Sequence, residues 1–516
     1  MMSMSTRRFS LGPLVAAAAL VAPLVSSWFV ACSSSVPRQS AAEEPRPEAG
    51  RPPVTGVDGG APLDSSVPDV DPRPPFDPSD EPVVCTAAPC AVELAAGAAH
   101  FCARMSDGTV RCWGNNVNGE LGGAPSLPAP DAGAPDASDP DAGDSGAGDP
   151  DASNLDASSP PSDASALMDA GSRPIQVTGL AGVTQVSAGG TTTCARLGDG
   201  AVRCWGGNDR GQLGLENPAV SDALPHPLAS PVALGGPATR VDVGQRTACA
   251  ILASGEVHCW GSNAQLLLAR TDIDGGVNGA PERAQLGSAK IARTAAGTDT
   301  AFAVTTTGDL LSWGAVAGNE GIVAARVASL SPDPRPLPLG ISGVTSFSVS
   351  STTMYQPPGS GFPRPPVEPL GHACAVARGG QLYCWGGSNG GALGTGLPDP
   401  SKMPTRARVV SDKGYPQQVT AAGEITCVRL TDGTIQCAGD DARGALGRGT
   451  ADKFSMFFVP AKAFTGRAVQ VAAARAAVCA LAQGGTVSCW GSNELGELGL
   501  GTRDTAAHPT PAPIRF

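Results

Sequence analysis

The stretch Cys194-Ala195-Arg196-Leu197-Gly198-Asp199-Gly200-Ala201-Val202-Arg203-Cys204-Trp205-Gly206 decides the fold, because it recurs in recognisable form seven times along the 516-residue chain. The fourth copy in chain order has Phe302 and Ser312 in place of the two cysteines but keeps Trp313 in register. Six copies keep two cysteines ten positions apart: Cys102 and Cys112, Cys194 and Cys204, Cys249 and Cys259, Cys374 and Cys384, Cys427 and Cys437, and Cys479 and Cys489. Such regularity is typical of a propeller or a solenoid, in which each unit buries its apolar face against its neighbours.

Each copy is interpreted as a β-hairpin, because apolar residues alternate on both sides of a turn that contains a glycine such as Gly200. A spacing of ten places the two cysteines opposite each other, with Cα atoms about 4.5–5.5 Å apart, which is within the range of a disulfide. The joint loss of both cysteines in the fourth copy favours pairing within hairpins over pairing between copies. Reduced core cysteines and a zinc site are the alternatives, but zinc sites favour shorter spacings and four ligands at one point.

A longer pattern surrounds the hairpin. It begins as Gly97-Ala98-Ala99-His100-Phe101-Cys102, continues through Cys112-Trp113-Gly114-Asn115 and ends at Leu121-Gly122. Its tail recurs at 211–214, 391–394, 444–447 and 496–499. This pattern resembles the repeat of the regulator of chromosome condensation (RCC1-like) family over about residues 92–516, apart from insertions. The resemblance implies an all-β, seven-bladed propeller of four-stranded blades. It leaves the function open, because the family spans nucleotide exchange on a small GTPase, light sensing and inhibition of secreted enzymes.

Some copies depart from this pattern. The third and fourth have irregular tails, at 264–268 and from 315 onward, and the sixth has Ala438 where Trp is usual. We expect these blades to be less regular. The first repeat lacks a clean outer strand, whereas the chain ends in the Pro-rich segment 509–516. We therefore expect the C-terminal segment to supply a strand to the first blade and to close the ring without an open edge.

The N-terminal residues carry a predicted export signal. Arg7-Arg8 precede an apolar run from Leu11 to Val30, and Ala31-Cys32-Ser33 follows. This ending resembles the lipidation signal of bacterial lipoproteins. The resemblance implies a signal peptide over 1–31, lipidation of Cys32 and a location at the bacterial outer membrane or cell surface. An uncleaved membrane anchor is the alternative, since the run is long enough to span a bilayer. Residues 32–84, rich in Pro, Ala and acidic residues, are predicted to be a disordered tether before the propeller at 85–516.

The number of cysteines agrees with export. Of the 15 cysteines, Cys32 is assigned to lipidation and six hairpins use twelve. Cys85 and Cys90 remain and are close enough in sequence to close a small loop before the first blade. A full set of disulfides indicates an oxidising compartment such as the periplasm or the cell surface.

Residues 124–172 form an acidic low-complexity insert with ten Asp and no Lys, Arg or aromatic residue. We expect a disordered loop. Calcium binding is the alternative, but calcium loops need fixed Asp spacing and Gly turns. The net charge of −12 belongs to such tracts, because residues 33–84 carry −6 and the insert −10. The ring itself is therefore near neutral, which argues against nucleic-acid binding through a basic face.

A second insertion, residues 351–370, interrupts the turn before His372 that other copies keep short. It contains Tyr355, Phe362 and Arg364, residue types that are enriched in binding hot spots. Prolines at 357, 358, 363, 365 and 366 limit the entropy that the segment would lose on binding. It is therefore a candidate binding loop, with a tolerated surface insertion as the alternative.

The sequence shows no catalytic constellation, so no catalytic residue, cofactor or metal ligand is predicted. His100 and His372 share one turn position and are interpreted as structural. Gly386-Gly387-Ser388-Asn389-Gly390 matches a nucleophile motif but follows a hairpin rather than forming a strand-turn-helix elbow. We expect a monomeric propeller that binds an unidentified protein partner, contacts the membrane only through its lipid anchor, binds no nucleic acid and performs no catalysis. The alternatives are a lyase or hydrolase that uses the central cavity, and guanine-nucleotide exchange by analogy with the family.

Overall fold

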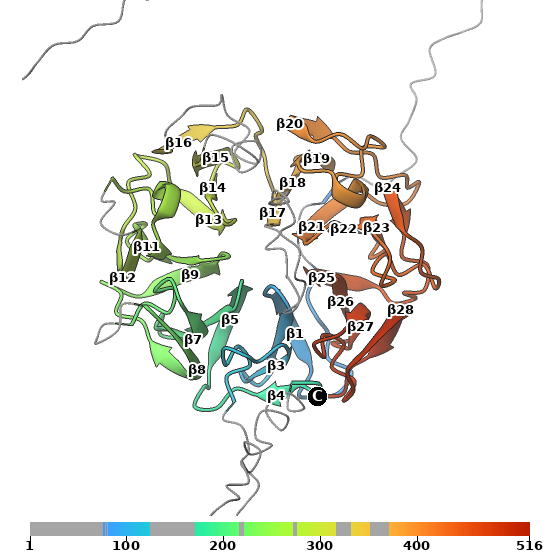
Figure 1. The fold of residues 1–516 in the computed structure, drawn as a ribbon, viewed down its shortest axis with the longest axis horizontal. Coiled ribbons are helices and arrows are strands. Elements are labelled where there is room, and N and C mark those ends of the chain that lie inside the picture. The colour runs from blue at the N-terminus through green and yellow to red at the C-terminus, as the bar shows by residue number, and fades with distance from the viewer. Residues whose placement is uncertain are drawn as a thin grey trace, which may run out of the picture. The chain divides into compact units, whose positions relative to one another are not determined.

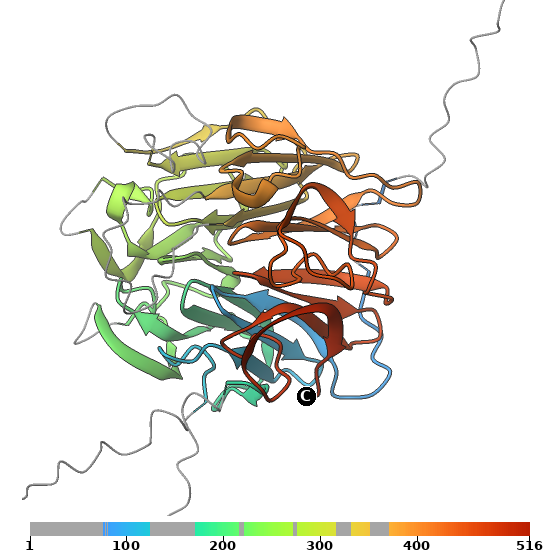
Figure 2. The same cartoon turned by 45° about the vertical axis from the view of Figure 1, so that its right-hand side comes forward.

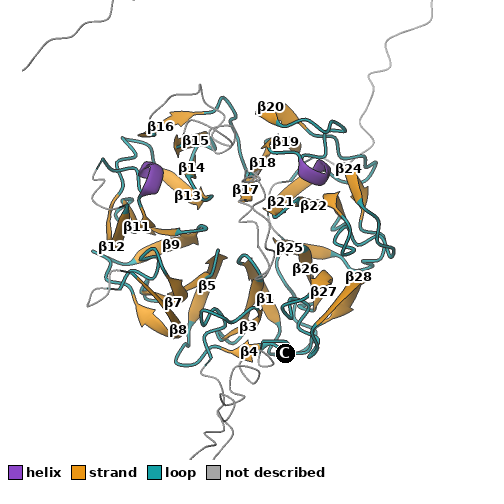
Figure 3. Ribbon diagram, viewed as in Figure 1, coloured by secondary structure: helices purple, strands orange, loops and turns teal. Residues whose placement is uncertain are grey.

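The computed structural model describes residues 76–77, 79, 81–123, 171–215, 221–271, 276–315, 332–350 and 371–516. All of them lie in one compact unit, Asp69–Phe516. Within them the chain forms seven four-stranded antiparallel sheets, each using four consecutive strands. The sheets stand around a central channel as the blades of a seven-bladed propeller (Figures 1 and 2). Helix is restricted to two 3₁₀ turns among the described residues, η1 (Ala264–Leu266) and η2 (Asn389–Gly391) (Figure 3).

Blades are numbered in chain order, and each runs from the channel to the periphery. The innermost strands are β1 (Ala91–Ala96), β5 (Val183–Gly189), β9 (Ala238–Val243), β13 (Ile291–Ala296), β17 (Ser346–Ser350), β21 (Pro416–Ala422) and β25 (Ala468–Ala474). The second strands are β2 (His100–Met105), β6 (Thr192–Leu197), β10 (Thr247–Leu252), β14 (Thr300–Thr305), β18 (His372–Ala377), β22 (Ile425–Leu430) and β26 (Ala477–Ala482). The third strands are β3 (Val110–Gly114), β7 (Val202–Asn208), β11 (Val257–Ser262), β15 (Leu310–Gly314), β19 (Gln381–Gly386), β23 (Ile435–Asp440) and β27 (Val487–Asn493). The outer strands are β4 (Ile175–Gln176), β8 (Asp222–Pro231), β12 (Val277–Arg283), β16 (Asp333–Pro338), β20 (Ser401–Arg406), β24 (Phe454–Pro460) and β28 (Asp504–Pro513).

The repeated hairpin is the second and third strand of each blade. Cys194 lies directly opposite Cys204, with Cα atoms 4.1 Å apart and a disulfide between them. In blade 4, Phe302 and Ser312 occupy the same opposed positions. The hairpin register is therefore the same with and without the disulfide.

The other cysteines of the repeats are paired in the same way. Each of the five remaining hairpins carries one disulfide within the blade, with Cα separations of 4.1–4.2 Å, a little shorter than the spacing expected from the sequence. The bonds join Cys102 to Cys112, Cys249 to Cys259, Cys374 to Cys384, Cys427 to Cys437, and Cys479 to Cys489. Cys85 is joined to Cys90 before the first strand. All seven disulfides are therefore local, and none links two blades.

The tryptophan in the third strand of the blade binds the tail of the preceding blade. Trp205 Nε1 donates to the Glu120 carbonyl at 2.8 Å, and Gly122 leaves room for this indole, since an added Cβ would lie 2.9 Å from Nε1. Equivalent bonds join Trp113 to Glu497, Trp260 to Gln212, Trp313 to Leu267 and Trp490 to Ala445. The Trp-Gly and Gly-x-Leu-Gly elements of the repeat thus meet across a seam between two blades rather than within one.

The irregular copies keep their four strands. In the tail of blade 3, Gln265, Leu266 and Ala269 adopt positive φ values of 58°, 62° and 53°, so the turn is kept without glycine. Blade 6 has no tryptophan at this position, and its Phe458 ring packs against Gly394 in the tail of blade 5 instead. A Cβ added to Gly394 would clash with this ring, just as a Cβ on the equivalent glycine would clash with the indole at other seams. The tail of blade 4 lies largely outside the described residues.

The prediction that the C-terminal strand completes the first blade is wrong. β28 pairs with β27 in blade 7, and the outer strand of blade 1 is β4, which follows the acidic insert. An insert of this length does not prevent pairing, because the entropy of loop closure grows only slowly with length. The C-terminal residues instead close the ring by packing, since Ile514 joins the cluster between blades 7 and 1 and Phe516 contacts Trp113 at 5.8 Å between ring centroids.

Residues at the end of the predicted tether also contact the ring. Glu81 forms an ion pair with Arg467 of blade 7, and the Val84 amide donates to the Gln483 carbonyl at 2.8 Å. The structured part of the chain therefore begins before residue 85. The predicted signal peptide, Cys32 and most of the predicted tether and of the acidic insert lie outside the described residues.

Candidate functional site: the central channel and its rim

Glutamine side chains join the innermost strands of neighbouring blades. Gln185 of β5 donates from Nε2 to the Val241 carbonyl at 2.7 Å and accepts the Val241 N–H at Oε1 at 3.0 Å. A glutamine amide can replace a peptide group in this way because it carries both a donor and an acceptor. The same two bonds join Gln418 to Val471 and Gln470 to Leu94.

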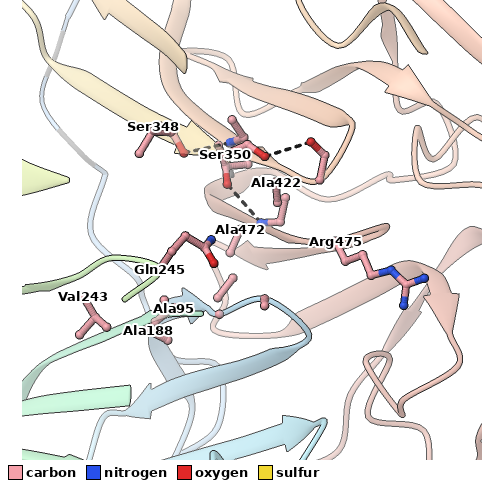
Figure 4. Close-up of a pocket in the computed structure, with 18 of the residues that line it drawn as sticks. Ala95, Ala188, Val243, Gln245, Ser348, Ser350, Ala422, Ala472 and Arg475 are labelled. Atoms are coloured by element: carbon pink, nitrogen blue, oxygen red, sulfur yellow. Dashed lines mark hydrogen bonds between the residues drawn. The ribbon is translucent and has the colours of Figure 1, made fainter. Parts of the chain in front are cut away.

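The other four seams use different side chains for the same purpose. The bonds are Val186 N–H to Glu93, Thr294 N–H to Asp242, Arg293 to the Phe347 carbonyl, and Val419 N–H to Ser346, at 3.3, 2.8, 2.8 and 3.1 Å. In Figure 4, Ser348 and Ser350 point toward the neighbouring inner strand, where they bond Ala421 N–H and the Gly423 carbonyl. Much of the polar lining of the channel therefore holds the ring together.

The two turn histidines lie at seams as well. His100 Nε2 is 2.8 Å from Thr193 Oγ1, and His372 Nε2 is 2.7 Å from Thr426 Oγ1 of the next blade. Both rings are buried, and burial lowers the pKa of each to about 4. They are neutral at physiological pH and hold seams, as their structural interpretation requires. The threonine partners were missed, although the sequence signals them: Thr follows the turn position only in the two copies that come directly after a His copy.

The channel has a cavity volume of about 1020 Å³. Small side chains from several blades line it, among them Ala95, Ala188, Ala422 and Ala472 (Figure 4). Charged groups of the lining come from β1, β9 and β13, namely Glu93, Arg240, Asp242 and Arg293. In the described part of the chain, no group of three His, Cys, Asp or Glu is arranged to hold a metal ion.

At the rim of the channel, blades 6 and 7 carry a charged cluster. Glu494 forms an ion pair with Arg443 and lies 3.8 Å from Arg475. Arg475 has a φ of 28°, whereas the same turn in blades 2 and 6 has Gly190 and Gly423 at φ 52° and 53°. A side chain in this region costs about 1–3 kcal/mol, and such strain often marks a functional site. The Arg475 side chain is nevertheless 44% exposed and extends from its turn (Figure 4).

The second insertion begins at the same rim. Ser350, which precedes it, lines the channel, and Gly371, which follows it, bonds the Gly387 amide through its carbonyl. Tyr355, Phe362 and Arg364 themselves lie outside the described residues.

Other predicted elements have plain structural roles. Ser388, in the nucleophile-like motif, is buried and donates its hydroxyl to the Leu397 carbonyl at 3.1 Å. Among the residues that the structure covers, no helix is both long and apolar enough to cross a membrane.

Comparison with known proteins finds a family that matches several of the repeats. Models of the regulator of chromosome condensation (RCC1) repeat match residues 91–120, 183–212 and 238–265 in one form, and 199–251 and 379–429 in another. These segments cover the hairpins of blades 1, 2 and 3, and also β19 of blade 5 and most of β22 of blade 6.

Individual similar proteins agree with these matches. The ultraviolet-B receptor UVR8 of Arabidopsis thaliana is 26% identical over 414 residues, which is 79% of this chain and 78% of the receptor. The secretion-regulating guanine nucleotide exchange factor of Bos taurus is 29% identical over 136 residues, and the chain spans only 29% of that protein. Yeast RCC1 (Prp20), solved bound to Kap60, superimposes with a TM-score of 0.58 at 16% identity, covering 84% of this chain and 87% of that one. The chain is thus a seven-bladed propeller in which five segments match models of the RCC1 repeat.

Proposed function

We propose that this chain is an exported propeller, tethered at the cell surface through a lipid on Cys32, that binds a protein partner at the channel rim without catalysis of its own. The observation that carries the proposal is the strained Arg475 in a charged cluster at the rim. A residue that costs stability where two other blades have glycine is expected to serve something other than the fold.

Two further features support the rim as the binding surface. The Pro-rich insertion, with Tyr355, Phe362 and Arg364, starts and ends at this face. Small side chains line much of the channel wall, and much of its polar lining is engaged in holding seams. Binding at a surface of loops on a rigid scaffold is a common arrangement.

The test compares two variants of one residue. Arg475→Gly relieves the backbone strain and removes the guanidinium, whereas Arg475→Ala keeps the strain and also removes the guanidinium. Partners are captured by cross-linking from intact cells, and the purified partner is then titrated against each form.

We expect both variants to bind the partner about tenfold or more weakly, as loss of a hot-spot residue does, and only Arg475→Gly to gain stability. Unchanged affinity for both variants would exclude Arg475 from the binding surface. Tyr355→Ala combined with Phe362→Ala tests the insertion in the same titration, and equal affinity would leave it a tolerated insertion.

The anchor has a separate test. Cys32→Ala should abolish incorporation of labelled fatty acid and leave the precursor uncleaved by the lipoprotein peptidase. Unchanged processing would point to an ordinary signal peptide or to an uncleaved anchor instead.

Guanine-nucleotide exchange is a second candidate, supported by the similarity to the bovine exchange factor. Exchange requires a GTPase in the same compartment, and an exported chain would be separated from cytoplasmic GTPases. Release of a labelled guanine nucleotide from a co-purified GTPase, accelerated by this chain, would favour exchange over simple binding.

A further inference from the structure

Arg240, on inner strand β9, is held in a fixed orientation inside the channel. Its Nε lies 2.8 and 3.0 Å from the two carboxylate oxygens of Asp242. Asp242 is fixed in turn by the amide and hydroxyl of Thr294 in the next blade, at 2.8 and 3.2 Å. This chain of contacts sets the plane of the guanidinium, so little freedom remains to be lost on binding.

The other edge of this guanidinium is open to the channel. The Arg240 side chain is 37% exposed and lines the cavity, and its two Nη atoms have no hydrogen-bond partner among the described residues. Two parallel N–H groups at the end of a guanidinium match the two oxygens of a carboxylate. Gln185, Gln418 and Gln470 occupy the same position on the inner strands of their blades, and their side-chain amides bond the backbone of the next blade. Arg240 differs from them because its Nη donors are not used in this way.

The neighbouring charges select the ligand. Asp242 and Glu93 both lie near Arg240, and Glu93 already accepts bonds from Arg104 Nε at 2.8 Å and from the Val186 amide at 3.3 Å. Two adjacent carboxylates repel a dianion such as phosphate more than a monoanion. We propose that Arg240 forms a carboxylate-binding site in the channel, which receives one carboxylate of a peptide that enters from the rim.

This inference rests on the proposed function for the source of the peptide, but it is tested with small probes on the purified full-length chain. The Nε–Hε resonance of Arg240 is assigned by its loss in Arg240→Lys. N-acetyl-tetraalanine, with a free C-terminal carboxylate, should shift this resonance saturably. The C-terminal amide of the same peptide should not. A blocked peptide with one internal Asp tests whether a side-chain carboxylate is accepted as well.

Arg240→Gln and Arg240→Lys should each weaken binding of the acid peptide about tenfold or more, since a bidentate charged bond contributes more than about 1.4 kcal/mol. Arg335→Gln is the matched control, because Arg335 also pairs with an Asp two residues away, Asp333, but lies exposed on outer strand β16. Folding of each variant is checked by its far-ultraviolet spectrum and thermal unfolding.

Three results would overturn the proposal: no saturable shift in the native chain, an equal shift with the amide, or undiminished binding by a folded Arg240→Gln chain. Stronger binding of inorganic phosphate than of the acid peptide would likewise contradict the choice of a carboxylate. A negative result here leaves partner binding at Arg475 untouched, so the two proposals fail separately.

Discussion

Blades 2 and 4 solve the same structural problem in two ways. In blade 2, Cys194 and Cys204 are both fully buried and are joined covalently across the hairpin. In blade 4, Phe302 stands opposite Ser312 in the same register, and its ring lies 4.9 Å from that of Phe347 in the next blade. A disulfide stabilises mainly by restricting the unfolded chain, whereas a buried aromatic ring stabilises the folded core. Packing between blades can thus replace a bond within one blade.

The largest effect should come from removing the packing of blade 4. Phe302→Ala is expected to lower the free energy of unfolding by about 3–5 kcal/mol, because it empties a fully buried site between Phe347 and Trp385. Denaturant unfolding with the disulfides intact measures the change. Phe454→Ala, on an exposed outer strand, is the control and should cost far less. A loss below about 1 kcal/mol at Phe302 would mean that the hairpin of blade 4 is stable without either a disulfide or a buried aromatic ring.

A second comparison concerns two seams, between blades 1 and 2 and between blades 4 and 5, and the effect of acid on the stability that they provide. His100 and Thr193 stand at the seam of blades 1 and 2, where the seam of blades 4 and 5 has Thr300 and Ala373. Because burial lowers the pKa of His100 to about 4, below its unfolded value near 6.5, the folded state binds the proton less readily. Stability is therefore complete above about pH 6.5, falls as pH drops toward 4, and levels off below that value.

Each such histidine accounts for a loss of about 3 kcal/mol over this pH range. The double variant His100→Thr with Thr193→Ala, which copies the seam of blades 4 and 5, should remove one such loss. Unfolding measured at pH 7 and pH 4 tests this expectation. Identical pH dependence in the variant and the native chain would show that folding does not lower the pKa of His100.

The disulfide of blade 2 should contribute slightly less. Replacing Cys194 and Cys204 together by Ala is expected to cost about 2.5 kcal/mol, the value that chain entropy predicts for a loop of this size. Denaturant unfolding of the double variant measures the loss. A cost as large as that of Phe302→Ala would indicate that the two sulfur atoms act chiefly as core packing.

The smallest effect is expected at the tail that receives Trp313 of blade 4. Gln265 is exposed and has a φ of 58°, so Gln265→Gly should stabilise the chain by roughly 0.5–1 kcal/mol through relief of backbone strain. Ala264→Gly, at a neighbouring exposed position without positive φ, should destabilise it slightly. Thermal unfolding of both variants separates strain relief from a general effect of glycine.

Much of the fold could be predicted from the sequence because its signals are local. The spacing of ten between Cys194 and Cys204, with a turn glycine midway, determines a hairpin register whatever surrounds it. Closure of the ring was predicted wrongly. The acidic insert separates β4 from the hairpin of blade 1, and the sequence does not say with which hairpin β4 or β28 pairs. For the candidate site, the insertion 351–370 stays a predicted binding loop, and neither Arg475 nor Arg240 was predicted.

By itself, the sequence determined seven repeated units, the hairpin within each and the positions of the cysteines, because residues about ten apart in an antiparallel turn have only one way to meet. The tertiary structure alone decided which groups meet across the seams. Gln185 and Val241, or His100 and Thr193, are more than fifty residues apart, and their contact depends on the placement of whole blades. The strain at Arg475 and the open edge of Arg240 arise in the same way, since each depends on backbone and side chains that the closed ring brings around it.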